Sequence, residues 1–225
     1  MRAVVAREPG GVDVLEIVDV PRPVPGPLEV LVRNFAAALN RADLLQRRGL
    51  YPPPPGDSDV LGLEFAGEVA ECGAEVRGLR RGDRVFGLVG GGGYAELLKV
   101  DHRLAVPIPD NLSYDAAAAV PEAFYTANES LFTLGRLAAG DVVVIHAGAS
   151  GVGSAAIQLA RARGAVVVAT AGTAEKLDRC RLLGAVFPAE TVDAARGVEE
   201  PLLPRVIGVA GIADFDVNRR GGGPG

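Results

Sequence analysis

The chain has 225 residues, of which 48% are apolar, and its 23 basic and 28 acidic residues give a net charge of -5. Such a chain can bury a core in one large domain or two modest ones, and the acidic balance argues against a nucleic-acid partner, whose surface is normally basic. No signal peptide and no run of about 18 apolar residues is present, so we expect a cytoplasmic protein without membrane contact.

The first 122 residues predict a compact, mostly β domain. Short β-branched runs alternate with stiff turns such as PRPVPGP (21–27) and YPPPPG (51–56). One short helix, NRADLLQRRG, interrupts them, with Asn40 in the cap position and Gly49 just past its end. The strands are expected at 2–7, 15–20, 29–34, 64–73, 82–88, 90–100 and 104–109.

The pattern changes from Ser113 onwards. A helical stretch with a break at Pro121 is followed by two buried strands, DVVVIHAG (141–148) and AVVVAT (165–170), each leading into a helix. Continuous apolar strands that alternate with helices indicate a parallel sheet.

We therefore predict an α/β chain in three parts. A mostly β domain over 1–122 precedes an incomplete Rossmann-type parallel βαβ domain over 123–187. A divergent, poorly ordered tail over 188–225 follows, because its prolines and Gly/Arg-rich end interrupt every periodic pattern.

A glycine-rich turn, HAGASGVG, joins the first buried strand to its helix. The free N–H groups at such a helix start, together with the helix dipole, form an anion site. Its spacing is G-x-x-G-x-G rather than the usual G-x-G-x-x-G, so an ordinary strand-to-helix turn is the alternative. The candidate pyrophosphate-binding residues are Gly148, Ser150, Gly151, Val152 and Gly153.

The end of the second buried strand favours NADPH over NADH as the cofactor. NAD sites usually place an acid there to bind the ribose 2′-hydroxyl, but this chain has Thr170, followed by Gly172 and Thr173. Lys176, one helical turn further on, suits a 2′-phosphate. The alternative for Lys176 is a solvated helix residue.

Four motifs resemble those of the zinc-free quinone oxidoreductases of the medium-chain dehydrogenase/reductase superfamily, of the tumour-suppressor-inducible type related to zeta-crystallin. They are AAALNRADLLQRRGLYPPPPG, LGLEFAGEV, GGGGYAELLKV and AVPEAFYTA, in the family's order. The resemblance covers about residues 1–186 and implies a GroES-like first domain. Zinc-dependent members place Cys and His where this chain has Asn40 and Leu63, so no metal site is expected with two Cys and two His in all.

The resemblance also implies roles for individual residues. Asn40, Asp43 and Tyr51 would lie near the nicotinamide and the substrate, and Thr126 would approach the cofactor. Each has a plainer alternative: Asn40 and Asp43 cap and charge their helix, and Tyr51 packs a turn.

The implied activity is hydride transfer from NADPH to a quinone without a metal. Relatives are longer, however, and strand VVVIH (142–146) is expected to keep one unpaired apolar edge unless RVIGVAGI (205–212) supplies a strand. Such an edge favours a homo-oligomer or pairing with another chain. The alternatives are a catalytically impaired short form that binds NADPH or a partner, and, as the lesser one, an enoyl reductase.

Overall fold

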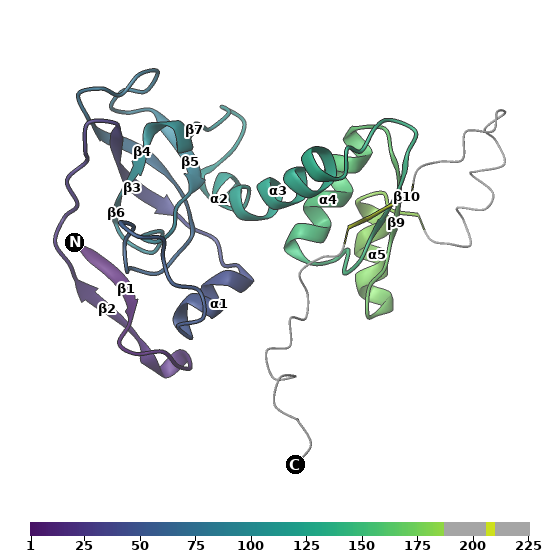
Figure 1. Cartoon of the computed structure of the whole chain (residues 1–225), viewed down its shortest axis with the longest axis horizontal. Helices are drawn as coiled ribbons and strands as arrows, with labels where there is room; N and C mark the ends of the chain where they lie inside the picture. The colour runs from purple at the N-terminus through teal and green to yellow at the C-terminus, as the bar shows by residue number, and fades with distance from the viewer. Residues whose placement is uncertain (187–205, 210–225) are drawn as a thin grey trace, which may run out of the picture. The chain divides into compact units, whose positions relative to one another are not determined.

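The computed structural model describes residues 1–186 and, by their backbone, 206–209 (Figure 1). The chain divides into two compact units, Met1–Glu122 and Ala123–Gly225. No helix in the described part of the chain is long and apolar enough to cross a bilayer.

The first unit is built on a five-stranded antiparallel sheet with the order β6-β3-β4-β5-β7. A two-stranded ribbon, β1 with β2, joins it through a bridge between Ala3 and Ala95. Valine and leucine side chains from β3, β4, β5 and β6 surround Phe65 in the core. The strands are β1 (Arg2–Ala6), β2 (Leu15–Asp19), β3 (Glu29–Ala36), β4 (Glu64–Cys72), β5 (Arg84–Leu88), β6 (Leu97–Asp101) and β7 (Val106–Pro107), with single turns η1 (Val12–Val14) and η2 (His102–Leu104). The predicted mostly β domain is confirmed.

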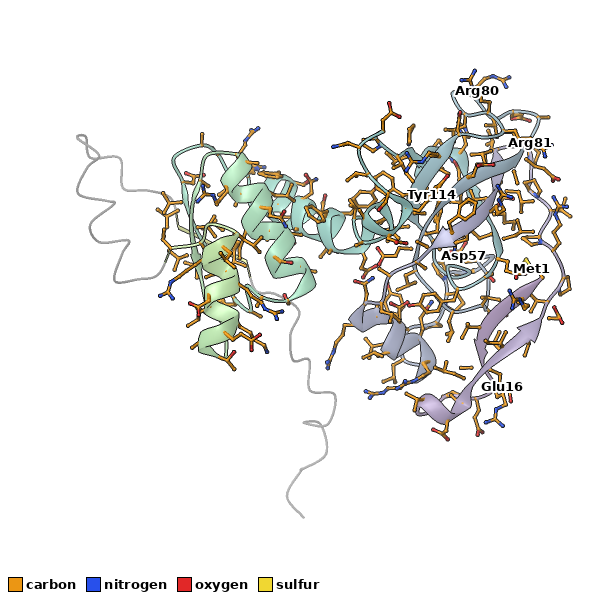
Figure 2. All side chains as sticks on the ribbon, turned by 180° about the vertical axis from the view of Figure 1, so that it is seen from behind. Met1, Glu16, Asp57, Arg80, Arg81 and Tyr114 are labelled. Atoms are coloured by element: carbon orange, nitrogen blue, oxygen red, sulfur yellow. The ribbon has the colours of Figure 1, made fainter. Side chains whose placement is uncertain are left out.

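Two short helices accompany this sheet. Helix α1 (Arg41–Arg47) follows β3, is capped by Asn40 and ends before Gly49, whose φ of 69° suits glycine. This confirms the predicted helix and cap. Helix α2 (Tyr114–Ala118) packs on β3, β4 and β5. Figure 2 shows Tyr114 at its start, where the Arg84 guanidinium carbon lies 4.8 Å from the ring centroid.

The second unit begins within α3 (Pro121–Asn128), which starts at the predicted break and continues as a π-helical segment, η3 (Glu129–Leu134). Strand β8 (Val142–Ile145), helix α4 (Gly151–Ala162), strand β9 (Val166–Ala169) and helix α5 (Ala174–Leu182) follow. Val143 and Ile145 of β8 are buried against small residues of α4, so the helix lies close to the sheet. This confirms the start of a parallel βαβ region.

The sheet of the second unit has the order β10-β8-β9, and both pairings are parallel. Strand β10 (Val206–Val209) comes from the region predicted as a poorly ordered tail and pairs with β8 along its length. RVIGVAGI therefore supplies the strand that was named above as the exception, and this edge of β8 is paired. Val186 makes a parallel bridge with Val168 on the far side of β9. The other residues of 188–225 lie outside the described part.

Candidate functional site

The glycine-rich turn of the second unit ends in a capped helix. Ser150 is the N-cap of α4, and its Oγ accepts a hydrogen bond from the Gly153 N–H at 3.0 Å. The N–H groups of Gly151 and Val152, in the first helical turn, have no carbonyl partner within the helix. Ala147, before the turn, has a φ of 53°, in the left-handed region. The helix start thus offers two N–H donors that have no partner among the described residues, beside one hydroxyl.

The three glycines of the turn occupy different surroundings. A β-carbon on Gly148 would lie 2.9 Å from the Cys180 Sγ, and one on Gly153 would lie 2.8 Å from the Gly148 Cα and collide with the Ala147 carbonyl oxygen. Gly148 and Gly153 are therefore required by the chain's own packing. A β-carbon on Gly151 would meet only the Ala123 methyl, at 4.0 Å. That space is free for a ligand, so the turn fits the pyrophosphate of a dinucleotide.

The ends of β8 and β9 meet through two side chains. His146, directly after β8, has its Nδ1 3.0 Å from the Thr170 Oγ1, directly after β9. Thr173 caps α5, and its Oγ1 accepts from the Lys176 N–H at 3.3 Å. A β-carbon on Gly172 would meet nothing within 4 Å, and the exposed Lys176 has no ion pair with the residues that the structure describes. Small residues and one unpaired cation thus surround the strand end.

The first unit contains a buried polar cluster around the start of α1. The Asn40 N–H donates to the Asp43 Oδ2 at 2.6 Å, as one half of a capping box. The Asn40 Nδ2 donates to the Glu64 Oε1 at 2.5 Å, and the Glu122 N–H donates to the Glu64 Oε2 at 3.1 Å. Glu64, only 1% exposed, therefore joins the first residue of β4 to the starts of α1 and α3.

A close approach of two loops brings Tyr94 to the same cluster. Gly62, just before β4, has a φ of 98°, and a β-carbon there would lie 2.6 Å from the Tyr94 nitrogen. The Tyr94 N–H donates to the Leu61 carbonyl at 2.8 Å, and its hydroxyl donates to the Ala38 carbonyl at 3.0 Å. Since this hydroxyl has one proton, Asp43 Oδ1 is left as a buried oxygen without a donor among the described residues.

Burial controls the protonation of this cluster. It raises the pKa of Asp43 and of Glu64, and the hydrogen bonds that each accepts offset only part of the effect. Burial also raises the pKa of Glu122, which the charge of Asp43 raises further. The pKa of Tyr94 is raised by burial first and then by the charge of Asp43. Tyr94 therefore stays neutral, and the acids hold their protons to higher pH than exposed acids do.

The structure joins some of the predicted site residues and not others. Asn40 and Asp43 are bonded to each other, but Tyr51, 46% exposed, makes no hydrogen bond to either. Thr126 is half-buried on α3, where its carbonyl accepts from the Ser130 hydroxyl. The half-buried side chain of Val152 packs against the core of the second unit, so only its backbone N–H is available to a ligand.

Sequence reasoning missed Glu64 and Tyr94. A signal for Glu64 did exist: it is the one charged residue in the otherwise apolar run LGLEFAG. Tyr94 had a weaker signal: it is an aromatic residue that directly follows four consecutive glycines. Their partners come from segments far away in the sequence, so neither could be assigned a contact in advance.

Residues 26–110 match the alcohol dehydrogenase GroES-like domain family. In the sequence, the start of a parallel βαβ, Rossmann-like region follows this domain. The chain carries the GroES-like domain found in the medium-chain dehydrogenase/reductase superfamily, and it is similar to solved members of that superfamily. These solved structures include a NAD-dependent alcohol dehydrogenase and a quinone oxidoreductase complexed with NADPH.

Three superfamily relatives illustrate the similarity. The chain is 38% identical over 226 residues to a mycocerosic acid synthase-like polyketide synthase of Mycobacterium tuberculosis. The aligned region covers 96% of this chain and 11% of the synthase. It is similar to the CurK enoyl reductase structure, with 30% identity, a TM-score of 0.76, and coverage of 83% of this chain and 58% of that one. It is also similar to the Escherichia coli quinone oxidoreductase complexed with NADPH, with 32% identity, a TM-score of 0.74, and coverage of 84% and 58%.

The chain spans about a tenth of the length of the curated superfamily relatives that it matches, and 62% of the length of an alcohol dehydrogenase structure with 39% identity. The similarity therefore covers only part of each of these proteins.

Proposed function

We propose that this chain takes part in the NADPH-dependent reduction of a carbonyl compound conjugated to a carbon–carbon double bond, such as a quinone or an enoyl thioester. The observation that carries this proposal is the Asn40 amide, which is fixed by Asp43 and Glu64 and is half-exposed. An amide N–H held in this way can donate to a carbonyl oxygen on which negative charge develops.

The cofactor assignment rests on the second unit. Gly151, with space for a pyrophosphate, and the N–H groups of the first turn of α4 would hold the diphosphate beside Ser150. The 2′-phosphate would lie near Thr170, Gly172, Thr173 and Lys176, since this strand end carries no acid to bind a free 2′-hydroxyl. NADPH, when bound, supplies the hydride.

We propose that no metal takes part. Leu63, which occupies the position of a histidine ligand in zinc-dependent members by resemblance, is buried and apolar. Asn40 is bonded to Glu64 in the place of a cysteine ligand. A tetrahedral zinc site needs thiolate or imidazole ligands at these places. The charge that a metal would stabilise would instead meet the Asn40 amide donor.

The two substrate classes have separate support. The similarity to a polyketide synthase and to the CurK enoyl reductase favours an enoyl thioester. The similarity to the Escherichia coli quinone oxidoreductase favours a quinone. Both substrates place a carbonyl oxygen in conjugation with the carbon that accepts the hydride, so one donor serves both.

A melting experiment followed by an assay tests the proposal. The purified chain should show a cooperative thermal transition that NADPH raises more than NADH does, because a ligand of the folded state raises the midpoint. Consumption of NADPH at 340 nm is then measured with 1,4-naphthoquinone and with a crotonyl thioester. Faster turnover of one identifies the substrate class. A melting transition that responds to neither cofactor would overturn the proposal.

A further inference from the structure

Both oxygens of the Glu64 carboxylate are occupied by donors. Asn40 Nδ2 donates to one at 2.5 Å, and the Glu122 N–H donates to the other at 3.1 Å. Glu64 and Asp43 are the buried charged side chains of the described residues. Because burial of a carboxylate is costly unless it is hydrogen-bonded, both contacts are needed to keep Glu64 inside.

The contact with Glu64 determines which way the Asn40 amide faces. A carboxylate is an acceptor, so the Asn40 side chain must turn its NH₂ group towards it. The Asn40 oxygen faces the Asp43 backbone N–H as the second half of the capping box. One amide hydrogen is therefore engaged by Glu64, and the amide oxygen is turned towards the helix start. One N–H of a half-exposed side chain remains.

We infer that Glu64 is a positioning residue, which orients the Asn40 amide so that it presents a hydrogen-bond donor and makes the site selective for substrates with a carbonyl oxygen. This inference rests on the proposed function, since it assigns the free N–H to the substrate oxygen. Glu64 itself touches no substrate and acts through Asn40.

Neither glutamine nor an apolar residue at position 64 would do the same. A glutamine has one oxygen and one NH₂ group, and would have to face two donors, so it would release Glu122 or reverse the Asn40 amide. A reversed amide would present its oxygen, which repels a carbonyl oxygen. An apolar residue would leave the Asn40 orientation unfixed.

A variant that exchanges the amide and the carboxylate between positions 40 and 64 distinguishes the orientation of the amide donor from the packing of the two side chains. In Asn40→Asp/Glu64→Gln, the NH₂ group of the introduced glutamine donates to the carboxylate of the introduced aspartate, while the glutamine oxygen accepts from the Glu122 N–H. Aspartate is also a good N-cap, so the cap of α1 is kept. Shape, net charge and the number of hydrogen bonds are preserved, but position 40 no longer has a donor.

We expect the exchanged protein to melt within a few degrees of the wild type while its kcat falls by about a hundredfold, the scale seen when one donor to a developing oxyanion is removed. The KM for NADPH should not change. A merely structural role for Glu64 would return both stability and kcat to the wild-type values. Wild-type kcat in the exchanged protein would overturn the inference.

A double-mutant cycle asks the same question if the exchanged protein does not fold. Glu64→Gln should lower kcat in the wild-type background and have no further effect on Asn40→Ala, because Glu64 acts through Asn40. An equal loss in both backgrounds would contradict the positioning role.

The side-chain amide of Asn40 provides a readout without turnover. In the wild type, ¹⁵N-resolved spectra should show one Asn40 amide proton shifted by a hydrogen bond, and Glu64→Gln should remove that shift; an unchanged shift would count against the inference. If this contact is present but no substrate is reduced by the wild type, the proposed function fails while the orientation by Glu64 stands.

Discussion

Gly151 and Gly153 lie two residues apart in the first turn of α4, but a methyl group has room at only one of them. At Gly151 it would meet the Ala123 methyl at 4.0 Å, whereas at Gly153 it would lie 2.8 Å from the Gly148 Cα and collide with the Ala147 carbonyl. Gly151 therefore leaves space for a ligand, whereas Gly153 is required by the packing of the fold.

Gly151→Val should weaken NADPH binding and leave stability nearly unchanged. Its side chain would fill the space in which a pyrophosphate approaches the backbone. We expect at least a tenfold rise in Kd, measured by titration of NADPH fluorescence, because an approach to the backbone N–H groups is blocked. Gly153→Ala is the contrasting variant and should lower the melting midpoint. An unchanged NADPH affinity in Gly151→Val would remove the turn from the site.

Lys176→Ala should weaken the binding of NADPH more than that of NADH. The Lys176 ammonium has no ion pair with the described residues, so it is available to the 2′-phosphate that only NADPH carries. Loss of one charge-assisted contact predicts about a tenfold fall in the NADPH-to-NADH preference. Arg179→Ala is the control, since this cation of the same helix is paired with Glu175. Equal weakening of both cofactors would contradict the 2′-phosphate role.

The free energy of unfolding of Asp43→Asn should increase relative to that of the wild type as the pH rises. Burial raises the pKa of Asp43 above its value in the unfolded chain, so the folded state binds this proton more tightly. The resulting stabilisation is complete below about pH 4, the unfolded pKa, and is lost as the pH rises through the folded pKa. The asparagine variant does not titrate there and is spared this loss.

Urea unfolding at pH 4, 6 and 8 measures the effect in Asp43→Asn. The difference in unfolding free energy from the wild type should grow with pH, by about 1.4 kcal/mol for each unit that separates the two pKa values. Asp59→Asn, which removes an exposed carboxylate, is the control. A difference independent of pH would show that the pKa of Asp43 is not raised.

Ala147→Gly should stabilise the second unit. Ala147 has a φ of 53°, which costs an alanine about 1 kcal/mol but glycine almost nothing. We expect the free energy of unfolding to rise by up to about 1 kcal/mol, with the greater flexibility of glycine in the unfolded chain offsetting part of the gain. Ala149→Gly, in the same turn without a positive φ, should destabilise. A loss in both variants would mean that the left-handed turn carries no strain.

Local patterns predicted most of the fold. The β-branched runs of the first unit and the Gly and Pro residues between them define strands by short-range chemistry, as does the cap at Asn40. Strand β10 is hard to predict because VIGV is short and β8, its partner among the described residues, lies about 60 residues earlier. A strand of four residues is specified by the neighbour with which it pairs, and a linear pattern does not contain that neighbour.

Only those parts of the candidate site that have local sequence signals could be predicted. The glycine-rich turn and the strand end at Thr170 are local signals. The Asn40–Glu64–Glu122 connection, by contrast, joins residues 24 and 58 positions apart. A buried acid is stable only with partners, and those partners become visible only when the chain has folded.

The order β10-β8-β9 has a consequence for where a ligand can enter the second unit. The chain runs from β8 to β9 on one side and returns to β10 on the other side of β8, so the direction of winding reverses at β8. In open parallel sheets such a reversal separates the connections that leave neighbouring strands and opens a crevice at their carboxyl ends. The turn from His146 to Gly153 begins at that end of β8, so the topological switch point and the glycine-rich turn coincide.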